Sequence, residues 1–238
     1  MTPERMFADL LAREPGRPFV TYYDESTGER SELSAKSLAN WVAKTHHLLT
    51  DELGLGVGDT ALIALPAHWI SVPALLGCLT AGLRLTASQG DDAAVAFVSP
   101  DTAAAGVGVA DVYAIAPDGA ARGFGGGTPG GTEDYVVAVR PQADAWGGVR
   151  FRAGEDDPCL GAQSRGDTAS RALERANLLG LREGARVLST TPWIGADSWI
   201  DTLLAPLAVG GSVVYIRNCD DEEVLARRTA QERVTNRI

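Results

Sequence analysis

One stretch decides the fold of this chain, the run Asp157-Pro158-Cys159-Leu160-Gly161-Ala162-Gln163-Ser164-Arg165-Gly166-Asp167-Thr168. Its first half predicts a short buried strand, and its second half, from residue 163 to 168, predicts a polar loop before a helix. A strand pattern follows at residues 186–191, then a second helix, then an apolar strand at 211–216. Strands that alternate with helices predict an α/β fold with a mainly parallel sheet flanked by helices.

The N-terminal part of the chain continues this pattern. Apolar spacing predicts a short first helix that ends before Pro15-Gly16, and a β-hairpin follows over residues 19–33. Ser34 is then the expected N-cap of a long helix. The remaining expected elements are a strand at 60–65, a helix at 69–81, strands at 94–99 and 112–116, a helix at 132–139, and a charged helix at 220–233.

Two regions of the sequence carry a resemblance to a known family. The first is the turn Gly54-Leu55-Gly56-Val57-Gly58-Asp59, followed by a strand that ends at Pro66 and a helix that ends at Ala81-Gly82. The second is the stretch from 157 to 218. In this order they resemble the N-terminal, AMP-binding region of the adenylate-forming superfamily, which includes acyl-CoA synthetases, peptide-synthetase adenylation domains and luciferases. The resemblance implies the α/β fold of that N-terminal region, including the N-terminal hairpin.

The same resemblance identifies a candidate site for ATP or AMP. The family places a Ser/Thr/Gly-rich loop that ends in Pro-Lys-Gly after the Asp-Pro strand, and here that place is taken by Ser164, Arg165, Gly166 and Thr168. Glycines and hydroxyls suit a phosphate, but no lysine occurs between residues 45 and 238, and Asp167 would repel a phosphate. Arg165 replaces the missing cation only in part, because a guanidinium is a planar fork. The alternative is a vestigial structural turn.

A second candidate site follows the strand at 186–191. The segment Thr191-Pro192-Trp193-Ile194-Gly195-Ala196-Asp197 stands where the family carries an element beside its acyl pocket. The resemblance therefore implies a substrate pocket formed by Trp193, Asp197 and Trp199. The alternative is that both tryptophans belong to the hydrophobic core, as large aromatic residues beside a sheet often do.

Composition excludes several classes of function. The formal net charge of the 238 residues is -10 and basic residues are not clustered, which argues against a nucleic-acid partner. No apolar run is long enough to span a membrane, and no export signal is evident, so a cytoplasmic protein is expected. Three separated cysteines favour buried, reduced thiols, and the three histidines form no metal-ligand pattern with them. We expect one domain over residues 1–238, with an internal boundary at the Gly-rich loop 123–131.

The functional expectation follows from what the sequence lacks. In the family, adenylation also needs an adenine-contacting loop, a magnesium-binding Thr-Glu pair, a ribose-binding Asp and a lysine on a C-terminal domain. None of these motifs occurs here, and Lys36 and Lys44 match neither family lysine. We therefore predict no catalytic residue and no metal, in a degenerate, truncated relative similar to short bacterial members of the family. It would bind an adenine nucleotide, an acyl group or a protein.

Two alternatives belong to other classes. The first is a residual enzyme that uses an acyl-adenylate together with a partner that supplies the missing half. The second is an interaction module, in which the apolar face that meets the rest of a synthetase forms a homodimer instead.

Overall fold

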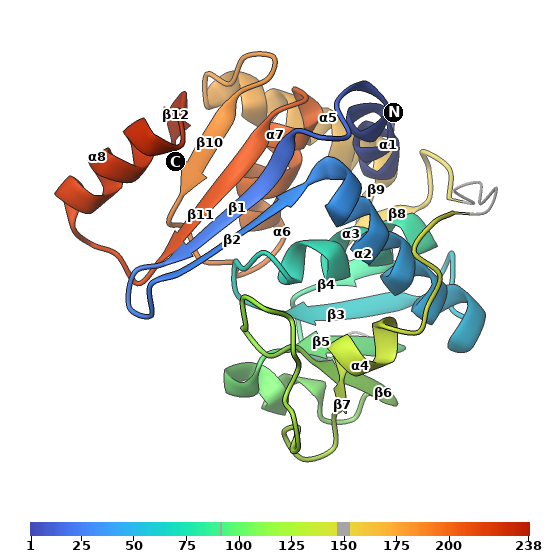
Figure 1. The fold of residues 1–238 in the computed structure, drawn as a ribbon. Coiled ribbons are helices and arrows are strands. Elements are labelled where there is room, and N and C mark those ends of the chain that lie inside the picture. Colours follow the sequence, from blue (N-terminus) through green and yellow to red (C-terminus); the bar gives the residue numbers. More distant parts are fainter. Residues whose placement is uncertain (91, 147–152) are drawn as a thin grey trace.

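The strands of the protein form two sheets. The computed structural model describes residues 1–90, 92–146 and 153–238 (Figure 1). The first sheet has the order β12 (Asn236–Arg237), β10 (Arg186–Ser189), β11 (Ser212–Arg217), β1 (Pro18–Asp24), β2 (Glu29–Ser34). The second has the order β7 (Glu133–Asp134), β6 (Asp111–Ala114), β5 (Val95–Val98), β3 (Thr60–Ala64), β4 (Arg84–Thr86), β8 (Pro158–Leu160), β9 (Gln163–Ser164). The hairpins β1–β2 and β8–β9 are antiparallel, and the other pairings of the described strands are parallel.

Helices cover both sheets. They are α1 (Pro3–Arg13), α2 (Ala35–His47), α3 (Ser71–Ala81), α4 (Tyr135–Val139), α5 (Arg165–Leu178), α6 (Ala196–Trp199), α7 (Ala205–Ala208) and α8 (Glu222–Gln231). Three further helical segments, two π-helices and one 3-10 helix, are η1 (Leu48–Glu52), η3 (Ile200–Leu204) and η2 (Pro100–Gly106). Within the described ranges, no helix combines the length and the apolar character needed to cross a membrane.

The core lies between the two sheets. Along β11, Val213 and Tyr215 face the large central core, whereas Val214 and Ile216 face the outer side, where α8 packs. This alternation is the period of two that a strand imposes on its side chains. In Figure 1, α2 and α3 lie between the sheets, and α8 lies on the far side of the first sheet. The carboxyl ends of strands from both sheets therefore meet at one edge of the central core.

Most of the elements expected from the sequence are confirmed. The hairpin, the long helix after Ser34 and the strands on either side of η2 all form, and the Ser34 hydroxyl accepts a hydrogen bond from the amide of Ser37 at 3.1 Å. Gly82 ends α3 in the left-handed conformation, with φ of 95°. A residue with a Cβ would be strained there, which explains why a glycine follows the alanine-rich helix.

Two expectations about local structure are wrong. Residues 163–168 do not form a loop: the first two belong to the hairpin β8–β9, and α5 begins at Arg165. The single expected sheet is two sheets, because β1 pairs with the distant strand β11 rather than with β3. The short strands β4, β7 and β12 were also not expected, and β7 takes up Glu133 and Asp134, which were predicted to begin a helix. Residues 123–131 form no helix or strand, and a domain boundary there stays a prediction.

The cysteines are free thiols, as expected. Cys78 and Cys159 are buried, and Cys219 is half-buried. Burial raises the pKa of Cys159 to about 11 and outweighs the nearby Arg165, which acts in the opposite direction. At neutral pH this thiol is protonated and unreactive.

A buried carboxylate fixes the C-terminal segment on the first sheet. Glu232 follows α8, accepts a hydrogen bond from Tyr23, and pairs with Arg186 at 2.5 Å and with Arg30 at 3.2 Å. Burial alone would raise the pKa of Glu232, but these donors outweigh it and hold the pKa below its usual range. The ionised carboxylate therefore stabilises the folded chain.

We expect Glu232→Gln to lower the free energy of unfolding at pH 7 by about 2 kcal/mol, because charge-assisted hydrogen bonds are lost. Because the pKa of Glu232 is lower in the folded than in the unfolded chain, its ionisation stabilises the folded protein. This contribution is fully present above the pKa of the unfolded chain, about 4.3, and is lost as the pH falls through the pKa of the folded chain. The difference between wild type and variant should therefore shrink below pH 4. Urea unfolding from pH 3 to 8 measures it, and a difference that stays constant with pH would contradict the assignment.

Candidate functional site

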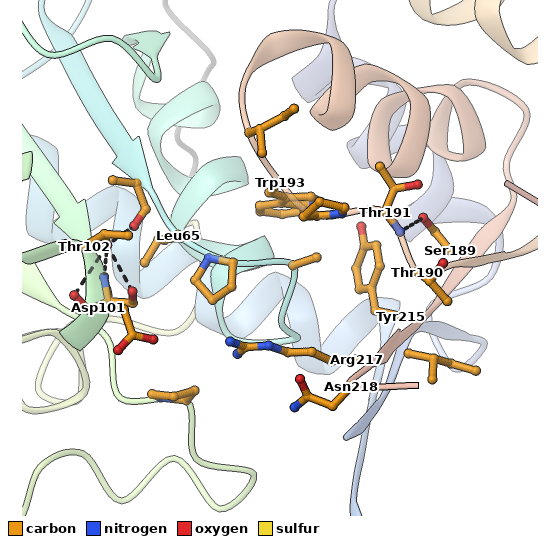
Figure 2. A pocket seen from close by; sticks show the side chains of 18 of the residues that line it. Leu65, Asp101, Thr102, Ser189, Thr190, Thr191, Trp193, Tyr215, Arg217 and Asn218 are labelled. Carbon is orange, nitrogen blue, oxygen red and sulfur yellow. Dashed lines mark hydrogen bonds between the residues drawn. The ribbon is translucent and has the colours of Figure 1, made fainter. Parts of the chain in front are cut away.

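A cavity of about 480 Å³ opens between the two sheets. Its walls are the segments that follow the carboxyl ends of β3, β5, β10 and β11, together with residues after β4 and β6. Figure 2 shows Leu65, Asp101 and Thr102 on one side of the cavity and Trp193 and Tyr215 on the other. Ligands of parallel α/β folds bind outside the carboxyl ends of strands, and this volume is typical of a small-molecule site.

The aromatic wall of the cavity is held rigidly. Trp193 donates a hydrogen bond from Nε1 to the Thr202 hydroxyl at 2.9 Å, and its ring packs edge-on against Tyr215 with the ring centres 5.9 Å apart. The Tyr215 hydroxyl in turn donates to the Thr202 carbonyl at 3.0 Å. Because η3 supplies both partners, the two rings have little freedom to move. A fixed aromatic surface suits an apolar or planar ligand group.

The polar part of the cavity follows β11. Arg217 is the last residue of the strand, and Figure 2 shows its side chain extending into the cavity. Asn218 has a φ of 55° and donates from Nδ2 to both carboxylate oxygens of Asp24, at 3.0 and 3.1 Å. Burial alone would raise the pKa of Asp24, but donors from Ser26 and Asn218 outweigh it and lower the pKa. The turn after β11 is thus fixed by an ionised carboxylate.

Of the three residues predicted to form a substrate pocket, the structure brings only one to this cavity. Trp193 lines it, and its role in binding a substrate stays a prediction. Trp199 lies in the central core and does not line the cavity. Asp197 is exposed and pairs with Arg171 at 2.7 Å on the surface. Because Asp197 and Trp199 are two residues apart in the short helix α6, their side chains point in different directions.

The candidate phosphate loop lies elsewhere, at the start of α5. Its backbone amides are already used: the N–H groups of Arg165, Gly166 and Asp167 donate to Asp157 O at 2.9 Å, Glu155 O at 2.8 Å and Ser164 Oγ at 3.0 Å. The Thr168 hydroxyl donates to the Ser164 carbonyl at 2.8 Å. An anion at this helix end would have to replace protein acceptors. Nucleotide binding at this helix end stays a prediction. The loop conformation on which that prediction depended is wrong.

Arg165 does not supply a cation to this surface. Its side chain is 0% exposed, pairs with the buried carboxylate of Glu4 at 3.0 Å, and donates to the carbonyls of Leu79 and Leu83, each at 3.0 Å. The guanidinium therefore joins α5 to α1 and to the end of α3. The prediction that Arg165 contributes a cation to an anion site is wrong, because its side chain points into the core rather than toward solvent.

Sequence reasoning missed Arg217 and Asn218. A signal was present, because a charged residue directly after an apolar strand of a parallel sheet lies at the edge where ligands bind. His68 follows the carboxyl end of β3. It is buried, its ring nitrogen Nδ1 accepts from the amide of Ile70, and its ring lies 4.2 Å from that of Tyr22. In the part of the chain that the structure describes, no group of three His, Cys, Asp or Glu residues could hold a metal ion.

Solved structures of synthetases share this fold. An acyl-CoA synthetase from Brucella canis matches with a TM-score of 0.78 and 16% identity, over 100% of this chain and 47% of that one. The acetoacetyl-CoA synthetase from Streptomyces lividans matches with a TM-score of 0.77 and 21% identity, over 98% of this chain and 41% of that one. The chain thus spans less than half the length of these enzymes. The fold is that of the N-terminal region of the adenylate-forming enzymes.

A closer relationship exists at the level of sequence. No family model matches the chain. A protein of Mycobacterium tuberculosis (strain ATCC 25618 / H37Rv), named TIGR03089 family protein, is 38% identical over 232 residues. The match covers 95% of this chain and 93% of that protein. The chain belongs to the TIGR03089 family.

Proposed function

We propose that this protein is a small-ligand-binding module that uses the cavity between its two sheets, and that it does not itself form adenylates. The observation that carries the proposal is the cavity itself, which lies at the carboxyl ends of parallel strands from both sheets and has a fixed aromatic wall. The fold suggests an acyl group or an adenine nucleotide as the ligand.

Two features support binding without adenylation. Adenylate formation concentrates negative charge on phosphate oxygens, and stabilising that charge needs preorganised cations or amide donors. The sequence has no lysine after Lys44, and Arg217 is the only lysine or arginine among the described residues of the cavity wall. The rim instead carries the carboxylates of Asp101 and Asp220. This balance of charge suits a ligand with little negative charge better than a triphosphate.

The proposal predicts that filling the cavity abolishes binding. Thr190 is exposed and lines the cavity, so Thr190→Trp places a large ring in the cavity without removing a core side chain. Isothermal calorimetry with octanoate, AMP and an octanoyl-adenylate analogue, with and without magnesium, should show saturable binding to wild type. The variant should bind at least about tenfold more weakly, because the ligand loses the surface that buries it.

The matched control is Asn177→Trp, which adds the same ring on the exposed surface of α5. It should bind like wild type. No heat with any ligand at millimolar concentration, or unchanged affinity in Thr190→Trp, would overturn the proposal. In a further titration with ATP added, octanoate binding that appears only with both magnesium and ATP would instead favour the residual enzyme that needs a partner.

A further inference from the structure

We propose that Arg217 is the anion-recognition residue of this cavity, positioned by Tyr22, and that the ligand carries one singly charged oxyanion on a compact apolar body. This inference rests on the proposed function, because it describes how the same cavity selects its ligand. Tyr22 lies outside the two regions that carry the resemblance to adenylate-forming enzymes, and Arg217 lies near the end of the second region, outside the candidate site residues that the resemblance identifies.

The charge of Arg217 is available to a ligand. The side chain is half-buried, and within the described ranges it forms no ion pair with a carboxylate, whereas Arg165, Arg186 and Arg228 each do. Figure 2 shows the guanidinium extending from the end of β11 into the space between the two sheets. A guanidinium presents several parallel donors that match the two oxygens of an oxyanion.

Tyr22 lies beside the guanidinium without neutralising it. Tyr22 is buried on β1, which pairs with β11, and Arg217 is close enough to act on the pKa of its hydroxyl group. Burial, followed by the neighbouring carboxylates of Asp24 and Glu29, raises the pKa of Tyr22 more than Arg217 lowers it. The phenol is therefore uncharged at neutral pH. An uncharged phenol at this position leaves the positive charge of Arg217 uncompensated.

The two nearby carboxylates are engaged by other groups. Asp24 accepts hydrogen bonds from Ser26 and Asn218. Glu29 accepts from the Ser31 hydroxyl at 3.2 Å and faces Nε2 of His68 at 3.4 Å. These contacts explain how a guanidinium can remain without an ion pair although two acidic residues lie on the neighbouring hairpin β1–β2.

The surroundings of Arg217 define the chemistry of the ligand. Asp101 and Asp220 are the other charged residues among the described residues of the cavity wall, and both are negative. With one cation and two anions around the cavity, a second negative charge on the ligand is disfavoured by repulsion. Leu65, Trp193 and Tyr215 provide apolar surface for the remainder of the ligand. A monovalent oxyanion with an aromatic or short aliphatic body fits this arrangement.

The test compares four probes that share one ring: phenylacetate and benzenesulfonate as monovalent anions, phenyl phosphate as a divalent anion, and phenylacetamide as the neutral analogue. Calorimetry should give wild type a preference of at least about tenfold for the monovalent anions over the amide. Arg217→Met should abolish that preference and leave amide binding unchanged, and Arg217→Lys should keep part of it. Tyr22→Phe should reduce the preference severalfold. Arg171→Met, at an exposed ion pair, should have no effect.

Each outcome decides the inference. If Arg217→Met keeps the preference for anions, Arg217 is not the recognition residue, although the cavity still binds. If phenyl phosphate binds more tightly than both monovalent anions, the assignment of a single charge is wrong. If Tyr22→Phe weakens all four probes equally, Tyr22 serves the shape of the cavity and does not position Arg217. If no probe binds wild type or any variant, both this inference and the proposed function fail.

Discussion

Arg165→Met should lower the free energy of unfolding by about 3–5 kcal/mol, because it leaves the buried carboxylate of Glu4 without its cation. Arg165 and Glu4 are 0% and 1% exposed, so water cannot solvate the remaining charge. The substitution also removes the donors to the carbonyls of Leu79 and Leu83 at the end of α3. Three helices would thus lose a shared contact at once. Urea unfolding at pH 7, followed by circular dichroism, measures the change.

Two controls make this result specific. Arg171→Met removes an arginine from an exposed ion pair and should change the free energy of unfolding by no more than about 1 kcal/mol. The double variant Glu4→Leu, Arg165→Met should recover part of the loss, because the unpaired charge is gone. If Arg165 were an exposed cation at the start of α5, its single variant would behave like Arg171→Met. A loss below about 1 kcal/mol would therefore contradict the buried pair.

Gly211→Ala should destabilise the protein by on the order of 3 kcal/mol, because a methyl group has no space at the start of β11. A Cβ at Gly211 would lie 2.3 Å from the carbonyl oxygen of Ala185 and 3.0 Å from that of Pro206. Both are backbone atoms, which cannot move aside as a flexible side chain can. The hydrogen bond from Ser212 N to Ala185 O, 2.8 Å long, lies at the same place and would be distorted.

The matched substitution is Gly16→Ala. No atom lies within 4 Å of a Cβ added at Gly16, and its backbone is not left-handed. The free energy of unfolding of the Gly16→Ala variant should therefore equal that of wild type or be slightly higher. Because β11 also carries Tyr215 and Arg217 to the cavity, Gly211→Ala should weaken ligand binding as well. Thermal and urea unfolding of both variants test the prediction. Equal stability of Gly211→Ala and Gly16→Ala would show that β10 and β11 can separate at this point without loss.

The sequence could predict the elements of the fold because their signals are local. The hairpin at residues 19–33, the Ser34 cap and the Gly82 stop each depend on neighbours only a few residues away, and each is confirmed. The hairpin β8–β9 was missed because residues 163–168 contain the polar and small residues of a loop. The same residues also suit a helix start, since Ser164 caps α5 and the first amides find acceptors nearby.

The candidate site was predicted only in part, because it depends on side chains that meet from distant strands. Trp193 was found through a motif and does line the cavity. Arg165 was misassigned because a guanidinium in a polar run looks exposed, and only its buried partner Glu4, 161 residues away, shows otherwise. Arg217 was missed because no local pattern separates a cavity-lining arginine from an arginine on the surface.

The sequence by itself determined the α/β class and the order of most elements. These properties follow from apolar periodicity, caps and turns, which act over a few residues. The likeness to adenylate-forming enzymes came from a resemblance of motifs and not from these local signals. Tertiary structure alone decided that β1 joins β11 in a separate sheet, that Arg165 is buried while Arg217 faces a cavity, and that Trp199 belongs to the core. The physical reason is that burial and ion pairing depend on which distant segments meet, and that choice is made by the packing of the whole chain.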